Sequence, residues 1–212
     1  TEMNDTEDKR QSRAGKGGKR GKTTIAGITL SNPDKVLFPD QGITKAELAS
    51  YLEEAAPHML PHLARRLVSF VRCPEGHDKE CFFQRHAGAG LSDAVKRLTI
   101  PANNGGTEEY LYIEDLKGLI ATAQIGVLEL HIWGIHVDNV EKPDRIVFDL
   151  DPAEDLPFAE VTAAALDMRD LLDALGLASF PMLTGGKGVH VIAPVTRRHE
   201  WPKARTARPP RP

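Results

Sequence analysis

Two aspartates one residue apart, Asp149 and Asp151, are the residues of this sequence best suited to bind catalytic metal ions. They close the segment 145–151, in which apolar and polar side chains alternate as in a β-strand. Both carboxylates should therefore lie on one face, about 6.5 Å apart along the strand. Carboxylates this close repel one another unless a cation lies between them. The pair predicts a site for two magnesium or manganese ions that promote phosphoryl transfer, the alternative being ordinary surface aspartates at a strand end.

A glycine-rich loop downstream has the composition of a polyphosphate-binding loop. It runs from Thr184 through Gly-Gly-Lys-Gly to His190. The glycines would let the backbone approach a polyphosphate, Lys187 supplies a positive charge, and His190 can donate a hydrogen bond. The loop is not a Walker A motif, because Lys187 is followed by Gly188 and a predicted strand instead of Ser or Thr and a helix. The alternative is a hairpin turn that exposes its lysine to solvent.

Histidines and cysteines earlier in the chain are weaker candidates. His131 shares a predicted strand face with Glu129 and Trp133, where it is either a site residue or a hydrogen-bonded structural residue. Four side chains invite a zinc interpretation: Cys73, His77, Cys81 and His86. The spacing of the two cysteines is not that of a standard zinc knuckle. We therefore expect both cysteines to be thiols, buried or partly exposed, and no disulfide framework.

The elements that must position these residues mix helices and strands. Thr44-Lys45-Ala46-Glu47 has the spacing of a capping box, so we expect a helix from Lys45 to about Ala56, ended by Pro57. A second helix is expected over residues 115–126. The pattern also predicts strands at 67–72, 110–113, 128–133, 145–151, 179–184 and 189–195, the last two as an antiparallel pair. The sequence thus indicates a mixed α+β fold.

A third helix should follow the aspartate pair. Asp155 is a plausible N-cap for it, and Gly176 should end it. Its apolar residues recur at helical spacing, which predicts one apolar stripe. The stripe consists of Leu156, Val161, Leu166, Leu171, Leu172 and Leu175.

Composition limits the class of protein. Of the 212 residues, 27% are charged and 41% hydrophobic, which is typical of a globular domain. No apolar run approaches the length of a bilayer span and no signal peptide opens the chain, so we expect a cytoplasmic protein without a membrane partner. Residues 1–24 have the composition of a disordered basic linker, 25–201 of one folded domain, and 202–212 of an irregular Pro/Arg-rich tail.

The charge distribution argues against a broadly basic surface for nucleic acid. Residues 23–196 contain 25 acidic and 14 basic side chains, while basic residues gather at both ends of the chain. DNA binding by this acidic core would therefore depend on a few placed cations and on bound metal ions.

Six segments together resemble a known family. They are Gly27–Pro39, Thr44-Lys45, Cys81–His86, Glu129–Gly134, Phe148–Pro152 and Gly185–His190. In this order they resemble the polymerase domain of bacterial DNA ligase D, within the archaeo-eukaryotic primase superfamily. The resemblance covers about residues 25–201 and implies a primase-polymerase-like fold, with a mixed or antiparallel sheet flanked by helices.

The resemblance also implies roles for individual residues. The ligands of the catalytic metals would be Asp149 and Asp151. The residues at the triphosphate of the incoming nucleotide would be His131, Thr184, Lys187 and His190, with Thr184 where many members have serine. The 5′-phosphate of a DNA end would be bound by Lys35 and Lys45. The aromatic residues that stack on the template would be Phe82 and Phe83, although either could instead pack in the core.

The implied activity is nucleotide transfer during DNA repair. A family member fills gaps and extends ends in non-homologous end joining, using manganese or magnesium and nucleoside or deoxynucleoside triphosphates. The implied partners are DNA ends with a 5′-phosphate, Ku, and ligase and phosphoesterase domains on the same or a companion chain, in the bacterial cytoplasm at the nucleoid.

One departure from the family concerns the third metal-binding aspartate. The family places it on a later strand, whereas Glu200 is the only acidic residue after Pro194. We therefore expect a domain truncated at its C-terminus, with incomplete catalytic strands and weakened metal binding.

Two other functions remain open from the sequence. The chain could be only a DNA-end binding module, because Lys35, Lys45 and the aromatics are present while the catalytic set is incomplete. It could also be a glycosyl or phosphoryl transferase that uses Asp-x-Asp with manganese. A haloacid-dehalogenase-type phosphatase is disfavoured, because Pro152 and Ala153 follow the pair.

Overall fold

The computed structural model describes residues 23–88, 90–101, 105–198 and 200. Three helices are found there: α1 (Lys45–Leu63), α2 (Leu116–Gln124) and α3 (Phe158–Ala174). The first eight strands are β1 (Thr23–Ile25), β2 (Ile28–Leu30), β3 (Val36–Phe38), β4 (Ile43–Thr44), β5 (Arg66–Arg72), β6 (Phe82–Gln84), β7 (Lys96–Pro101) and β8 (Thr107–Tyr112). The remaining strands are β9 (Val127–His136), β10 (Arg145–Leu150), β11 (Phe180–Leu183) and β12 (Val189–Pro194). The predicted mixture of helices and antiparallel strands is confirmed.

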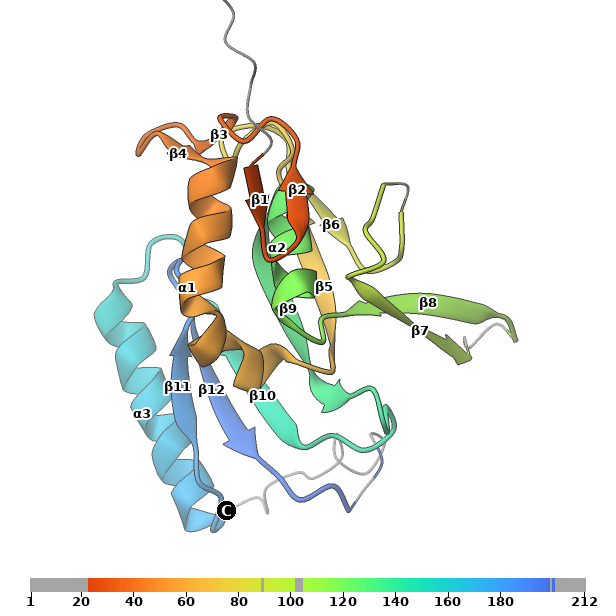
Figure 1. Ribbon diagram of the computed structural model, residues 1–212. Coiled ribbons are helices and arrows are strands. Elements are labelled where there is room, and N and C mark those ends of the chain that lie inside the picture. The colour runs from red at the N-terminus through yellow and green to blue at the C-terminus, as the bar shows by residue number, and fades with distance from the viewer. Residues whose placement is uncertain (1–22, 89, 102–104, 199, 201–212) are drawn as a thin grey trace, which may run out of the picture.

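The larger sheet has β5 at its centre. β5 pairs antiparallel with β6 and β8 along one edge and with β9 along the other, and β7 continues the sheet beyond β8. α1 and α2 pack together against one face, where Leu52, Phe70 and Leu119 belong to the main hydrophobic core. The β7–β8 hairpin extends away from this body, as Figure 1 shows. The other sheet face is therefore free to carry polar side chains.

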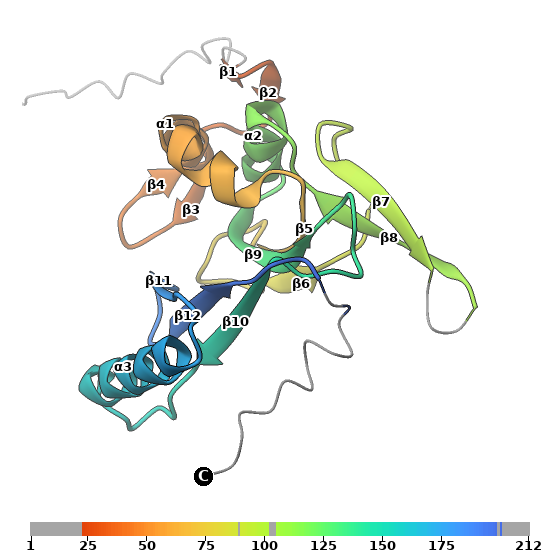
Figure 2. The same cartoon turned by 90° about the horizontal axis from the view of Figure 1, so that it is seen from below.

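The smaller sheet carries the aspartate pair. Its strand order is β10-β12-β11, all antiparallel, and α3 covers one face (Figure 2). Leu172 of α3, Val191 and Ala193 of β12 form a second core, against which Phe148 and Leu150 of β10 pack. The predicted alternation of β10 and the predicted hairpin of the last two strands are both confirmed.

The predicted end of α1 at Pro57 is wrong. The capping box forms as expected, with Thr44 Oγ1 accepting from Glu47 N and Glu47 Oε2 accepting from Thr44 N. The helix nevertheless continues through Pro57 and Pro61 to Leu63. Both prolines lie on the exposed side, where water can satisfy the carbonyls that lose their helical partners. Apolar contacts on the opposite side hold the helix together beyond the prolines.

The prediction for α3 is correct in its end and wrong in its beginning. Gly176 follows the last turn with φ of 72°, the left-handed conformation that ends many helices. The N-cap is Pro157, without a side-chain hydrogen bond, and not Asp155. The apolar stripe is largely uncovered, because the narrow three-stranded sheet contacts only one strip of the helix. Val161 and Leu172 are buried, whereas the other four are exposed: Leu156, Leu166, Leu171 and Leu175.

The prediction of two thiols is also wrong, because Cys73 and Cys81 form a disulfide. Strand register explains the pairing. Arg72 of β5 lies opposite Phe82 of β6, so the residues just beyond this pair meet across the mouth of the loop, with their Cα atoms 4.3 Å apart. The zinc interpretation falls with the thiols, and no metal-binding group of His, Cys, Asp or Glu occurs among the described residues.

The ends of the chain bear on the predicted boundaries. β1 begins at Thr23, two residues before the predicted start of the domain. The predicted linker at 1–24 lies mostly, and the predicted tail at 202–212 wholly, outside the described residues. No helix in the described part of the chain is long and apolar enough to cross a membrane.

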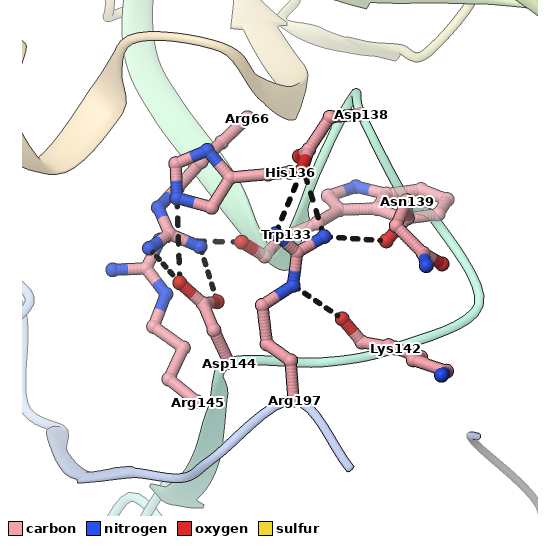
Figure 3. A network of polar contacts seen from close by, with 9 residues as sticks. All are labelled: Arg66, Trp133, His136, Asp138, Asn139, Lys142, Asp144, Arg145 and Arg197. Carbon is pink, nitrogen blue, oxygen red and sulfur yellow. Dashed lines mark hydrogen bonds and ion pairs between the residues drawn. The ribbon is translucent and has the colours of Figure 1, made fainter. Parts of the chain in front are cut away.

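A partly buried polar network connects the two sheets where β9 passes β10 (Figure 3). Arg66 of β5 donates two hydrogen bonds of 2.6 Å to Asp144, the residue before β10. Arg145 donates to Trp133 O of β9 at 3.2 Å. Burial and the charge of Arg66 lower the pKa of Arg145 to about 10, so it remains a cation at neutral pH. Arg66 and Arg145 thus both interact electrostatically with the carboxylate of Asp144.

The same network includes His136 and the segment after β12. His136 Nε2 lies 3.3 Å from Asp144 Oδ2, a contact that favours the charged ring. Burial and the charge of Arg66 outweigh it and lower the pKa of His136 below its ordinary 6.5. Arg197, beyond β12, pairs with Asp138 and donates to Lys142 O, both on the β9–β10 connection. The network therefore joins β5, β9, β10 and the end of β12.

Two neighbouring leucines of α3 should differ in their contribution to stability. Leu172 is 3% exposed and Leu171 is 45% exposed. Leu172→Ala should lower the free energy of unfolding by about 2–5 kcal/mol, because it leaves a cavity in the second core. Leu171→Ala should change it by less than about 0.5 kcal/mol. Urea denaturation measures both; equal losses would contradict this placement of α3.

His136 should make stability depend on pH. Its pKa is lowered in the folded protein, so the unfolded chain binds more protons between that lowered value and 6.5. The free energy of unfolding should therefore fall as pH drops below about 6.5, and His136→Gln should flatten this decline. Urea denaturation between pH 5 and 7.5 provides the measurement. His58→Gln, an exposed histidine of α1, is the control and should keep the wild-type profile.

Candidate functional site

Asp149 lies on the open face of the smaller sheet. It is paired across the sheet with His190 of β12, and Asp149 Oδ1 lies 3.2 Å from His190 Nε2. The Asp149 side chain is 65% exposed, so it can take further ligands. Asp151 is also exposed and follows the last residue of β10, Leu150. Strand register thus joins one predicted metal ligand to one predicted phosphate ligand.

The glycine-rich loop packs against the end of β10. A Cβ atom on Gly188 would lie 3.1 Å from Leu150 O and 3.8 Å from the Cα of Asp151, so a side chain there would push the loop away. Thr184 Oγ1 donates to Gly188 O at 3.1 Å and accepts from Gly186 N at 3.4 Å. These bonds close the loop over the threonine hydroxyl. The loop and the aspartates therefore lie side by side, although the sequence separates them by more than 30 residues.

Lys187 extends from the loop toward the turn after β10. Its Nζ atom lies 3.5 Å from Glu154 O, a long contact that leaves the ammonium available to a ligand. Lys187 thus brings a positive charge to the turn after β10, and His190 brings a ring nitrogen to Asp149. This is the arrangement expected for an anion that arrives with a bound cation.

The donors at this site suit a hard divalent ion only in part. Asp149 and Asp151 offer carboxylate oxygens, which magnesium and manganese prefer. Within the described ranges, no group of three or more His, Cys, Asp or Glu side chains could hold a metal ion. Magnesium commonly binds through one or two carboxylates plus phosphate oxygens of the substrate, and the two aspartates fit that mode.

A pocket of about 310 Å³ lies on the larger sheet, on the face opposite α1 and α2. It is lined by Ser69, Phe83, Arg85, His131, Ile132 and Trp133. His131 Nε2 donates to Glu129 Oε2 at 2.7 Å, and its ring meets the ring of Phe83 edge-on at 5.5 Å. Trp133 Nε1 donates to Ser69 Oγ, which fixes the indole. Flat rings beside a guanidinium suit a planar ligand that can stack on them.

Phe82 and Phe83 are both exposed, at 45% and 50%, so neither packs in the core. As neighbours on a strand they face opposite sides. The guanidinium of Arg72 lies 5.1 Å from the centre of the Phe82 ring, and that of Arg85 lies 5.3 Å from the centre of the Phe83 ring. Each exposed ring thus has a cation beside it, and Phe83 also lines the pocket.

Lys35 and Lys45 lie close together, in different environments. Lys45 N donates to Lys35 O, which holds the start of α1 against the segment before β3. The Lys45 side chain is buried, and its ammonium donates to Ser31 O at 2.9 Å and Gln124 O at 3.1 Å. Burial, and next the charge of Lys35, lower the pKa of Lys45 below 10.5. Lys35 is partly exposed and pairs with Glu75 at 2.7 Å.

Three of these residues were missed by sequence reasoning. Arg85 lies two residues after Phe83, and recognising a strand in this segment could have placed both on one face. Glu75 and Gln124 gave no such signal, because their contacts with Lys35 and Lys45 depend on tertiary packing.

Comparison with known proteins decides the family. Residues 44–209 match the family model of the LigD primase-polymerase domain. The chain belongs to this family. Lys35 precedes the matched range, and the other predicted site residues of the LigD-type domain lie within it.

Similar proteins extend the match to both sequence and structure. The chain is 37% identical over 180 residues to the multifunctional non-homologous end joining protein LigD of Pseudomonas aeruginosa, covering 85% of this chain and 21% of the relative. It is 31% identical over 169 residues to the bifunctional LigD of Bacillus subtilis, covering 80% and 27%. The chain thus spans about a quarter of these LigD relatives.

A solved structure shows the same fold. The polymerase domain of Mycobacterium tuberculosis ligase D, in complex with DNA, superposes with a TM-score of 0.72 at 34% identity. The match covers 82% of this chain and 62% of the other. The primase-polymerase-like fold that the sequence motifs implied is therefore confirmed.

The two lysines should differ in their effect on folding. Lys45→Met keeps the length of the side chain but leaves Ser31 O and Gln124 O without their donor, so it should lower the free energy of unfolding by about 1–3 kcal/mol. Lys35→Met removes only a partly exposed ion pair and should cost less than about 1 kcal/mol. Urea denaturation compares them. A harmless Lys45→Met would contradict the buried position of its ammonium.

Proposed function

We propose that this domain transfers nucleoside monophosphates from nucleoside or deoxynucleoside triphosphates to a primer 3′-hydroxyl, filling gaps and extending ends during non-homologous end joining. The observation that carries the proposal is the contact between the Thr184–His190 loop and the end of β10 in a chain of the LigD primase-polymerase family. A polyphosphate on the loop would lie beside two carboxylates that a divalent ion can bridge.

Different residues of the site would bind the metal ion and the triphosphate. Asp149 and Asp151 would hold magnesium or manganese, which supplies charge neutralisation at the α-phosphate and the departing pyrophosphate. Thr184, Lys187 and His190 would bind the triphosphate through a hydroxyl, an ammonium and a ring N–H. The primer oxygen then forms a bond to the α-phosphorus, and the bond to pyrophosphate breaks.

The pocket on the larger sheet would hold a base. Phe83 and Trp133 offer flat apolar surfaces, and Arg85 offers a cation. Stacking of this kind is tolerant of sequence, as a polymerase requires of its template contacts. His131, bonded to Glu129, would lie at the edge between the base and the triphosphate.

The DNA end would be recognised by its phosphate. Lys35 presents a partly exposed ammonium, and Lys45, whose ammonium uses two carbonyls, retains a third donor. We propose that both lysines bind a 5′-phosphate. The similarity to the Mycobacterium tuberculosis polymerase domain in complex with DNA supports this proposal. Ku and ligase and phosphoesterase domains would be partners, and the bacterial cytoplasm at the nucleoid would be the location.

A second candidate function is binding of DNA ends without catalysis. It is favoured by Lys35, Phe82 and Phe83, which are at least partly exposed and could contact DNA without a group of metal ligands. The phosphate-binding lysines and exposed aromatics do not depend on such a group, so binding could persist where turnover is weak.

Asp149→Asn provides the test. With manganese and a gapped duplex carrying a 5′-phosphate, the wild-type chain should add the templated nucleotide, and Asp149→Asn should slow this by about 100-fold or more. Calorimetry should show weaker manganese binding in the presence of a non-hydrolysable nucleotide. Asp167→Asn, an exposed aspartate of α3, is the matched control.

The outcomes separate the two functions. Addition that depends on Asp149 but not on Asp167 supports the polymerase. No addition by the wild type, together with tighter binding of 5′-phosphate than of 5′-hydroxyl ends, supports the binding module. Addition that Asp149→Asn leaves unchanged would refute the proposed metal site.

A further inference from the structure

Glu75 occupies the accessible side of the lysine pair. Its Oε1 lies 2.7 Å from Lys35 Nζ, while 73% of the Glu75 side chain is exposed. Both Lys35 and Glu75 act on the pKa of Lys45, so the three charges lie within one electrostatic neighbourhood. In the absence of DNA, Glu75 is therefore the anion that pairs with the cationic site formed by Lys35 and Lys45.

The position of Glu75 is set by its loop, not by chance contact of two long side chains. The loop between Cys73 and Cys81 is closed by the disulfide and by a turn in which Gly76 N donates to Cys73 O. His77 N donates to Leu37 O of β3 at 2.8 Å, only two residues beyond Lys35. The backbone that carries the carboxylate is thus tied to the strand that follows the lysine.

Burial on the other side of the loop adds to this constraint. Cys73 is buried and its N–H donates to Gly126 O at 2.8 Å. Gly76 is buried with φ of 118°, a conformation that residues with a side chain rarely adopt, and a Cβ there would lie 2.9 Å from Asp78 Oδ1. The backbone contacts of the loop therefore hold Glu75 in place, so the Lys35–Glu75 pair would separate by rotation of side chains and not by withdrawal of the loop.

We propose that Glu75 is a specificity-determining carboxylate that stands in for the DNA 5′-phosphate and competes with it for Lys35. This rests on the proposed function of Lys35 and Lys45. A terminal phosphate carries a charge of about −1.5 to −2, so it displaces a carboxylate of charge −1 and is then repelled by it. A 5′-hydroxyl end brings no such charge and leaves the Lys35–Glu75 pair intact.

The competition makes end binding reversible. When a phosphorylated end leaves, Glu75 recovers Lys35, so the ammonium is not left unpaired. The site therefore holds phosphate more weakly than two lysines alone would, and the loss falls on phosphorylated ends.

Glu75→Gln tests this inference, because it keeps the shape of the side chain and removes its charge. Fluorescence anisotropy with recessed duplex ends should show binding of the 5′-phosphate end tightened by about 2- to 5-fold, the range of an exposed ion pair. Binding of the 5′-hydroxyl end should not change. In a Lys35→Met background, Glu75→Gln should give no gain.

Asp78→Asn is the matched control. Asp78 lies on the same loop and pairs with Lys79 at 2.7 Å, so its substitution also removes one negative charge and frees one lysine. It should leave both affinities unchanged. Equal tightening by Asp78→Asn and Glu75→Gln would mean that only net charge matters, and would overturn the inference.

The remaining outcomes are distinguishable. If the wild type prefers 5′-phosphate ends and Glu75→Gln does not tighten their binding, the stand-in role is wrong while the phosphate site survives. If the wild type binds both ends equally, the proposed phosphate site fails, and the role of Glu75 fails with it. Urea denaturation of each variant confirms that it folds.

Discussion

The bidentate pair between Arg66 and Asp144 is the interaction on which the arrangement of the two sheets depends. Asp144 lies immediately before β10, and Arg66 begins β5, so their pair fixes the start of the aspartate-bearing strand to the centre of the larger sheet. Burial alone would raise the pKa of Asp144, but the hydrogen bonds and charge of Arg66 lower it, which keeps the carboxylate ionised. A charge buried in this way is costly unless it is paired, so neither partner can be lost alone.

From that junction the functional residues follow by strand register. β10 leads to Asp149, which β12 pairs with His190, and the close approach of Gly188 brings the phosphate loop to the same place. On the other side of the junction, β9 leads back through Trp133 to His131 in the aromatic pocket. Rigid strands, rather than loops, thus supply most of the predicted site, and the lysine pair lies apart from it at the start of α1.

Local patterns in the sequence predicted the parts of the fold that local physics determines. The capping box at Thr44, the alternation of β10 and the glycine that ends α3 were all readable, because each depends on a few neighbouring residues. The passage of α1 through Pro57, the exposed stripe of α3 and the Cys73–Cys81 bond were not, since each depends on what packs against the segment. The same applies to the site. Motifs named the lysines and aspartates, but only packing reveals that Lys45 is buried and that Glu75 lies on Lys35.

Gly134 allows β9 and β10 to approach each other closely where they cross. A Cβ atom at this position would lie 2.6 Å from Arg145 O, so the two strands can be this close only because residue 134 has no side chain. Asp149 lies four residues along β10, about 13 Å away at the usual rise of a strand. A methyl group at residue 134 would push the two strands apart and tilt β10. The resulting displacement would increase along β10 toward Asp149. The position of Asp149 relative to the aromatic pocket therefore depends on a glycine that is itself neither a predicted ligand nor a pocket-lining residue.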